Sequence, residues 1–192
     1  MNDTWRLFIA VELPANVLKT IGQVQSDLKR VIPERAVRWT RSDGIHLTLK
    51  FLGDVRTSQL DAIKAGLTQA AVGHSVFGLS IQGLGCFPNL ARPRVVWVGV
   101  TGDVKSLHAL QADVERDIAP LGFPAEERGF SPHLTLGRTS QGASRDDTAL
   151  IGKVVQDRDV GQLVSWQVGS VSLMRSQLKP DGAQYTQIAE VS

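Results

Sequence analysis

Polar and apolar residues alternate along two short stretches of the chain, residues 46–53 and 133–138, and both stretches begin His-Leu-Thr-Leu. This alternation is the period of a β-strand that buries one face. In the first stretch it predicts a core-facing set and an opposite set of side chains: Leu47, Leu49 and Phe51 against His46, Thr48 and Lys50. In the second stretch the leucines are expected in the core, and His133 and Thr135 emerge on the other face. The sequence therefore predicts two strands that each present a histidine and a threonine on one side.

The remaining hydrophobic pattern predicts further strands and helices around these two stretches. Apolar residues at helical spacing predict helices at residues 14–31, 57–72, 103–121 and 148–155. Runs rich in strand-forming residues predict strands at residues 5–13, 35–39, 75–83, 95–100, 161–167, 170–178 and 183–191. Segment 83–94, rich in Gly and Pro, is predicted to be a loop, and residues 179–182 a turn. This irregular order of strands and helices favours an α+β fold over a doubly wound sheet.

The two His-Leu-Thr-Leu stretches lie nearly half a chain length apart in a chain of 192 residues. That layout predicts two similar lobes, each of which carries one copy of the motif. A chain of this length fits one domain with a substantial core. We therefore predict a single domain over residues 1–192, with two pseudo-symmetric lobes.

Composition and charge narrow the class of protein only slightly. The chain has 21 Lys and Arg against 19 Asp and Glu, so bulk charge does not indicate a nucleic-acid binder. The single cysteine, Cys86, excludes an internal disulfide and a Cys-rich zinc site. No apolar run approaches the roughly 20 residues that cross a bilayer, and no signal-peptide pattern is visible. We expect a cytoplasmic protein without a membrane partner.

Two histidines on two strands can move protons in both directions within one reaction. Imidazole titrates near neutral pH, so one ring can accept a proton from water while the other gives one to a leaving oxygen. Phosphoester cleavage needs both transfers. Thr48 and Thr135 can donate hydroxyl hydrogen bonds to phosphate oxygens. Lys50 and Arg138 can add positive charge, although Arg138 reaches this face only if the strand bulges or ends at Gly137.

A single histidine on a strand is more often a surface or hydrogen-bonded residue than a catalyst. Repetition of the motif, in a chain with only four histidines, favours the catalytic interpretation for His46 and His133. The other two, His74 in a Gly-His-Ser turn and His108 on a predicted helix, are expected to be solvated. Neither motif has an acidic residue beside its histidine, so the sequence predicts no metal site. Two interacting rings predict a bell-shaped pH dependence.

The residues around the two motifs resemble the 2H phosphoesterase superfamily. Within it they resemble the bacterial and archaeal RNA 2′,3′-cyclic phosphodiesterases, historically called 2′-5′ RNA ligases. The similar segments are distributed over nearly the whole chain. They are residues 6–10, Trp39, residues 46–53, 93–98, 133–138 and 173–176, Gly182 and Tyr185.

That resemblance implies a bilobal, LigT-like α+β fold, in which two similar antiparallel-sheet lobes with outer helices surround a central cleft. It implies hydrolysis of a 2′,3′-cyclic phosphate on RNA or a nucleotide to a 2′-phosphomonoester, without a metal or cofactor. His133 would be the base that activates water, and His46 the acid that protonates the departing 3′ oxygen. The residues by themselves leave these two roles interchangeable. We expect a monomer that acts on RNA ends or nucleotides carrying the cyclic phosphate.

The same resemblance assigns substrate contacts to residues near the two histidines. It implies that Thr48 and Thr135 bind phosphate, that Arg138 contacts phosphate or substrate, and that Phe51 contacts a base. The last assignment conflicts with the alternation, which places Phe51 in the core. Both interpretations stand at this point.

Other functions fit the same motifs. The reverse reaction would join 2′,3′-cyclic phosphate and 5′-hydroxyl ends into a 2′-5′ linkage, although concentrated water favours hydrolysis. Cleavage of existing 2′-5′ linkages and hydrolysis of a nucleotide metabolite are further enzymatic alternatives. A non-catalytic RNA-binding module is an alternative of another class. The candidates for basic residues that contact the RNA backbone are Arg35, Arg38, Lys50, Arg92 and Arg94.

Overall fold

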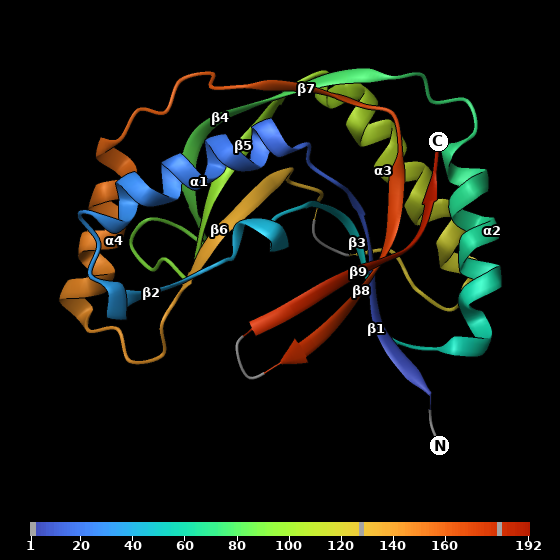
Figure 1. Cartoon of the computed structure of the whole chain (residues 1–192), viewed down its shortest axis with the longest axis horizontal. Coiled ribbons are helices and arrows are strands. Elements are labelled where there is room, and N and C mark those ends of the chain that lie inside the picture. Colours follow the sequence, from blue (N-terminus) through green and yellow to red (C-terminus); the bar gives the residue numbers. More distant parts are fainter. Residues whose placement is uncertain (1–2, 127–128, 180–181) are drawn as a thin grey trace.

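The computed structural model describes residues 3–126, 129–179 and 182–192. Within these residues the predicted order of strands and helices is confirmed, and the strands form two antiparallel sheets (Figure 1). The predicted loop at 83–94 is partly wrong, because β4 (Phe77–Phe87) extends into it. The predicted turn at 179–182 includes Pro180 and Asp181, which lie outside the described residues.

Each sheet carries one of the two motif strands. Sheet A contains, in spatial order, β3 (Leu47–Arg56), β1 (Thr4–Val11), β8 (Val171–Lys179) and β9 (Gly182–Val191). Sheet B contains β2 (Val37–Trp39), β6 (His133–Thr139), β5 (Val95–Gly102), β4 and β7 (Ser165–Val168). The motif strands β3 and β6 contact each other, so the two sheets meet where the histidines are.

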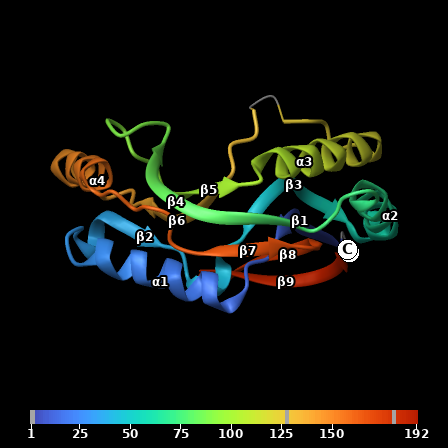
Figure 2. The same ribbon diagram turned by 90° about the horizontal axis from the view of Figure 1, so that it is seen from above.

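The helices are exchanged between the two halves of the molecule. The sheet A side carries α2 (Leu60–Ala71) and α3 (Val104–Ile118), and the sheet B side carries α1 (Ala15–Lys29) and α4 (Arg145–Asp157) (Figures 1 and 2). Yet α1 follows β1 of sheet A, and α3 follows β5 of sheet B. Each half therefore sends one helix across to cover the sheet of the other half.

Helix α4 shows how local sequence sets one of these boundaries. The hydroxyl of Ser144 accepts a hydrogen bond from the backbone N–H of Asp147, whose carboxylate accepts one from the N–H of Ser144. This capping box satisfies two N–H groups that a helix start otherwise leaves unpaired. The helix therefore begins at Arg145, three residues before the predicted start at Thr148.

Both motif strands contain one extra residue at the same place, directly after the threonine. In β3, Thr48 pairs with Ala10 and Lys50 with Ile9, so Leu49 is unpaired. In β6, Thr135 pairs with Trp97 and Gly137 with Val96, so Leu136 is unpaired. Such a bulge shifts the alternation by one residue. The fifth residue after each histidine is consequently turned to the same face as that histidine.

The bulges decide the positions of three predicted site residues. The prediction that Lys50 shares a face with His46 and that Phe51 lies in the core is wrong: Lys50 is 1% exposed and Phe51 is 60% exposed. The extra residue at Leu49 turns the side chain of Lys50 into the core and that of Phe51 to the exposed face. In β6 the strand bulges rather than ends, with Leu136 beside Gly137 as the unpaired residue, and the bulge brings Arg138 to the face of His133.

Each exchanged helix contributes a polar side chain next to a bulge, bonded to the backbone in β6 and to the Lys50 side chain in β3. The amide of Gln25, on α1, donates to the carbonyl of Leu136 at 2.7 Å and to that of Thr40 at 2.8 Å. In the other half, the Lys50 ammonium donates to the carboxylate of Glu115, on α3, and to the carbonyl of Pro124 at 2.9 Å. Buried polar groups are stable only when paired in this way.

At Gly137 the close approach of β2 leaves no room for a side chain. A Cβ at this position would lie 2.7 Å from Cγ1 of Val37 and 3.1 Å from the carbonyl oxygen of Arg38. The second motif therefore has glycine where the first motif has the buried Lys50.

We expect the Lys50–Glu115 pair to be a large local determinant of stability. Lys50→Met or Glu115→Gln alone should lower the free energy of unfolding by about 3–5 kcal/mol, because each leaves a charge without its partner, and the side chains of Lys50 and Glu115 are only 1% and 13% exposed. The double variant should recover most of that loss. Urea unfolding followed by tryptophan fluorescence measures all three.

Lys64→Met is the matched control, since Lys64 is 40% exposed and lies 3.6 Å from the exposed carboxylate of Asp61. Such a surface pair contributes about 0–1 kcal/mol. If Lys50→Met unfolds at the same urea concentration as Lys64→Met, the buried pair has no special role in stability.

Candidate active site

The ring of His46 lies against an aromatic cluster on the uncovered face of sheet A. It stacks on Phe8 with ring centroids 4.4 Å apart, and its edge contact with Tyr185 has a centroid distance of 4.9 Å. Phe8, Ala10 and Met174 form a small buried cluster beneath it, separate from the main core. His46 immediately precedes β3, so the strand start and the cluster together fix the ring.

Gly44, two residues before His46, lets Tyr185 approach this closely. A Cβ on Gly44 would lie 3.0 Å from the ring of Tyr185. The Tyr185 ring also meets Phe8 edge to face at 5.5 Å, so it closes the aromatic cluster from the side of β9. Burial among these rings lowers the pKa of His46 to about 4, because the charged imidazolium loses its hydration. His46 is therefore neutral at pH 7 in the free protein.

His133 is held by a polar contact as well as by aromatic rings. Its Nδ1 lies 2.7 Å from the carbonyl oxygen of Ser131. A carbonyl can only accept, so Nδ1 carries the hydrogen, and Nε2 of the neutral ring has a free lone pair. The ring also meets Phe87 edge to face at 4.8 Å and lies 6.3 Å from the ring of Trp97.

The pKa of His133 is also lowered, with three contributions. Burial lowers it most, the hydrogen bond to the Ser131 carbonyl raises it, and the positive charge of Arg138 lowers it. This effect agrees with the bulge in β6, which places Arg138 on the face of His133. Both histidines are thus disposed to be neutral, and the hydrogen bond to the Ser131 carbonyl fixes the tautomer of His133.

All but one of the predicted site residues lie on the same sheet faces as His46 and His133. Cross-strand pairing places Thr48 beside His46 on sheet A, and Thr135 beside His133 on sheet B; both threonines are partly exposed. Phe51 and Arg138 are exposed on the same two faces through the bulges.

Lys50 lies on the opposite face, buried against Glu115. A side chain on this face cannot reach a substrate bound beside the two histidines. The prediction for Lys50 failed because the bulge at Leu49 reverses the alternation from Lys50 onward.

Sequence reasoning missed three of the aromatic residues that surround the two histidines: Phe8, Tyr185 and Trp97. Strand β1 is apolar on both faces, so alternation does not mark Phe8 as a site residue. The available signal was the resemblance itself, which included residues 6–10, 93–98 and Tyr185.

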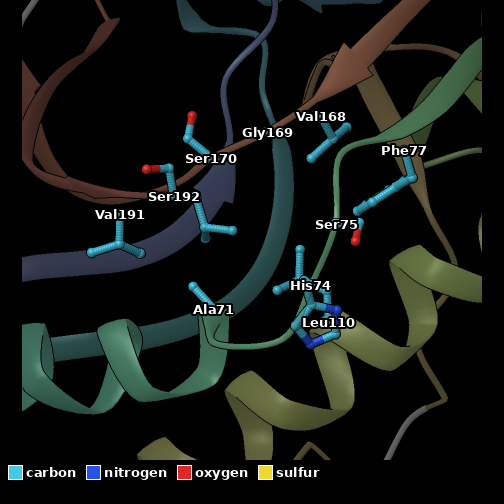
Figure 3. A pocket seen from close by; sticks show the side chains of 11 residues that line it. Ala71, His74, Ser75, Phe77, Leu110, Val168, Gly169, Ser170, Val191 and Ser192 are labelled. Atoms are coloured by element: carbon cyan, nitrogen blue, oxygen red, sulfur yellow. The ribbon is translucent and has the colours of Figure 1, made fainter.

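A small pocket lies elsewhere in the molecule, where the end of α2 meets the C-terminal residues (Figure 3). His74, Ser75, Val168 and Ser192 are among the side chains that line it, and neither His46 nor His133 does. Nε2 of His74 is 2.7 Å from a carboxylate oxygen of Asp113, so this ring already has a partner. The expectation that His74 is simply solvated is therefore wrong.

Among residues 3–126, 129–179 and 182–192, no three or more His, Cys, Asp or Glu side chains converge as metal ligands would. In the same part of the chain, no helix combines the length and apolar character of a membrane span.

A family model and the sequences of known proteins both point to the same family. Residues 13–180 match the family model described as the 2′-5′ RNA ligase superfamily. The RNA 2′,3′-cyclic phosphodiesterase of Methanothermobacter thermautotrophicus is 37% identical over 182 residues, which cover 94% of this chain and 95% of that protein. The RNA 2′,3′-cyclic phosphodiesterase of Aeropyrum pernix is 34% identical over 155 residues, or 81% and 85% of the two chains.

Solved structures agree with this result. TT0787 of Thermus thermophilus superposes with a TM-score of 0.78 at 28% identity, over 97% of both chains. Escherichia coli LigT in complex with 3′-AMP superposes with a TM-score of 0.75 at 25% identity, also over 97% of both chains. The LigT-like bilobal fold is thereby confirmed, and the chain belongs to the 2′-5′ RNA ligase superfamily, a group of 2H phosphoesterases.

Proposed function

We propose that this protein hydrolyses the 2′,3′-cyclic phosphate at the end of an RNA strand to a 2′-phosphomonoester, with His133 as general base and His46 as general acid. The observation that carries the proposal is the repeated arrangement of two His-x-Thr strands, each with a bulge after the threonine, where the two sheets meet. Relatives named RNA 2′,3′-cyclic phosphodiesterase, and the complex of LigT with 3′-AMP, support a substrate of this class.

The base step begins at His133. Its Nε2 lone pair takes a proton from water, and the water oxygen forms a bond to phosphorus. The Ser131 carbonyl accepts the hydrogen of Nδ1 and stabilises the positive charge that the ring acquires. This hydrogen bond supports the base role for His133, because the ring is presented with the correct nitrogen unprotonated.

The acid step ends at the 3′ oxygen. As the bond between phosphorus and the 3′ oxygen breaks, His46 donates its proton to that oxygen, and the phosphate stays on the 2′ oxygen. A ring with a pKa of about 4 is rarely protonated at pH 7. The negative charge of the bound phosphate favours the protonated ring, so substrate binding itself raises the pKa of His46. The proton is then delivered from an apolar site, where it is held weakly.

The remaining residues on the two faces bind the phosphate and the base of the substrate. Thr48 and Thr135 donate hydroxyl hydrogen bonds to the non-bridging oxygens, one from each sheet. Arg138 supplies positive charge beside His133, where the attacking water loses its proton. Phe51, exposed beside Phe8 with ring centroids 6.2 Å apart, offers a surface on which a base can stack.

We further propose that the protein acts as a cytoplasmic monomer, as the sequence predicts. The substrate would reach the histidines through the central cleft that the family resemblance implies.

Replacement of either histidine should abolish most of the activity. For a 2′,3′-cyclic-phosphate-ended oligonucleotide in the presence of a chelator, we expect His46→Asn and His133→Asn each to reduce kcat about 10²–10⁴-fold, because each removes one proton transfer. Phosphorus NMR identifies the product as the 2′-phosphomonoester. His108→Asn, an exposed position on α3, is the control and should retain wild-type activity.

Three results would contradict this mechanism. They are full activity in either histidine variant, loss of activity in chelator alone, and RNA binding by the wild type without any turnover. The last would favour the recognition module over the enzyme.

The pH profile should be bell-shaped and displaced to acid pH. The profile of kcat/KM reports the free protein, in which burial lowers the pKa of both histidines below 6.5. Activity requires neutral His133 and protonated His46, so kcat/KM should be greatest below pH 6.5 and fall on both sides. The optimum of kcat should lie at higher pH, because bound phosphate raises both pKa values. Coincident optima at or above pH 7 would argue against the lowered values.

Opening the aromatic cluster should raise the pKa of His46. Phe8→Ala admits water to a ring that burial now holds near a pKa of about 4, so the value should move toward 6.5. Titration of the histidine ring protons by NMR measures the change. Phe130→Ala, which removes a ring beside His108 instead, is the matched control and should leave the His46 titration where it is.

A further inference from the structure

Two arginines face each other across the pairing of β2 with β6. Arg38 is the cross-strand partner of Arg138, Val37 pairs with Thr139, and Trp39 with Gly137. Cross-strand partners point to the same side of a sheet, with Cβ atoms about 4.5–5.5 Å apart. Because the bulge turns Arg138 to the face of His133, Arg38 lies on that face too.

Burial of the neighbouring residues gives the same orientation independently. Val37 is 2% exposed in the main core, and Trp39 packs against that core. Arg38, between them, is exposed. Alternation along β2 therefore sends the two flanking side chains toward α1 and the core, and Arg38 to the uncovered face.

This pair is unfavourable for the free protein. Like charges placed directly opposite each other in a sheet are destabilising. In the described part of the chain no carboxylate forms an ion pair with Arg38 or Arg138, whereas Arg35, three residues before Arg38, lies 3.0 Å from a carboxylate oxygen of Asp147. Two unpaired guanidinium groups side by side form a site for an anion, and phosphate matches their geometry.

The position of the pair indicates which phosphate it receives. Strand β6 carries His133, Thr135 and Arg138 on one face, and β2 is the edge strand beyond it. Adjacent strands are about 4.8 Å apart. Arg38 is therefore one strand farther than Arg138 from the histidine that acts on the terminal phosphate, in the direction of the sheet edge.

We propose that Arg38, with Arg138 beside it, binds the phosphodiester group that joins the terminal nucleotide to its neighbour. The substrate is then an RNA end of at least two nucleotides, and a cyclic mononucleotide fills only part of the site. This inference rests on the proposed hydrolysis of cyclic phosphate ends and specifies the class of substrate for it.

The test compares two substrates in the wild type and in Arg38→Gln. One is a 2′,3′-cyclic mononucleotide without a 5′ phosphate, and the other is a dinucleotide with the same cyclic end and one internal phosphodiester. We expect Arg38→Gln to lower kcat/KM for the dinucleotide about tenfold, the value of one charge-assisted hydrogen bond. For the mononucleotide kcat/KM should be unchanged, and Arg38→Lys should restore part of the loss.

The matched control is Arg145→Gln, which removes the same charge from an exposed position at the start of α4. It should change neither substrate. A second readout is the salt dependence of inhibition by the 2′-phosphate-ended dinucleotide. Loss of one phosphate contact should reduce the slope of log Ki against log salt by about 0.7, the value for single strands.

Three outcomes would overturn the proposed subsite: an equal loss for both substrates, no loss for either, or the same loss in Arg145→Gln. Urea unfolding of Arg38→Gln should show no loss of stability, because one of two facing like charges has been removed. Failure of the proposed function looks different, since the wild type would then hydrolyse neither the mononucleotide nor the dinucleotide.

Discussion

The extra residue in each histidine strand is the constraint on which the rest of the site depends. Regular alternation would place His, Thr and the fourth residue after His on one face. With the bulge, the fifth residue takes that place, and the fourth is turned into the protein. A bulge interrupts the hydrogen-bonded ladder of its strand. In β6 a helix from the other half compensates for this, because Gln25 donates to the carbonyl of Leu136; in β3, Glu115 instead pairs with the side chain of Lys50, which the bulge turns inward.

The same backbone device serves two different chemical environments. On sheet A the bulge exposes Phe51, and His46 lies among aromatic rings that displace water from it. On sheet B the bulge exposes Arg138, and His133 is tied to a backbone carbonyl. One histidine is thus held by apolar packing and the other by a hydrogen bond. Two rings with equivalent places in the backbone thereby become suited to opposite proton transfers.

The sequence predicted the order of the elements and the faces of both histidines and both threonines. These follow from local alternation and helical spacing, which act over a few residues. The bulge at Gly137 could be anticipated because glycine and the position of Arg138 both suggested it. The bulge at Leu49 could not, since residues 46–51 alternate regularly and the adjacent apolar pair Phe51 and Leu52 comes only after it. Lys50 was therefore misplaced, and its partner Glu115 lies 65 residues away in the chain.

The pairing of the arginines and the exchange of the helices are also beyond local sequence signals. Arg38 is opposite Arg138 only because β2 and β6, which are distant in sequence, pair in one register. Trp39 is part of the family resemblance, but the sequence alone does not show which face of the sheet the side chain of the neighbouring Arg38 occupies. The register of β2 against β6 determines that face.

The exchange of α1 and α3 has a consequence for how the molecule can change shape. Neither sheet is covered by helices from its own half alone. The two lobes are therefore linked by the exchange of one helix in each direction. Any rotation of one lobe against the other would pull a helix off the sheet it covers and strip polar partners from a bulge. The spacing of the two histidines is therefore set by the packing of the whole chain, and half of the chain would be an unfinished domain.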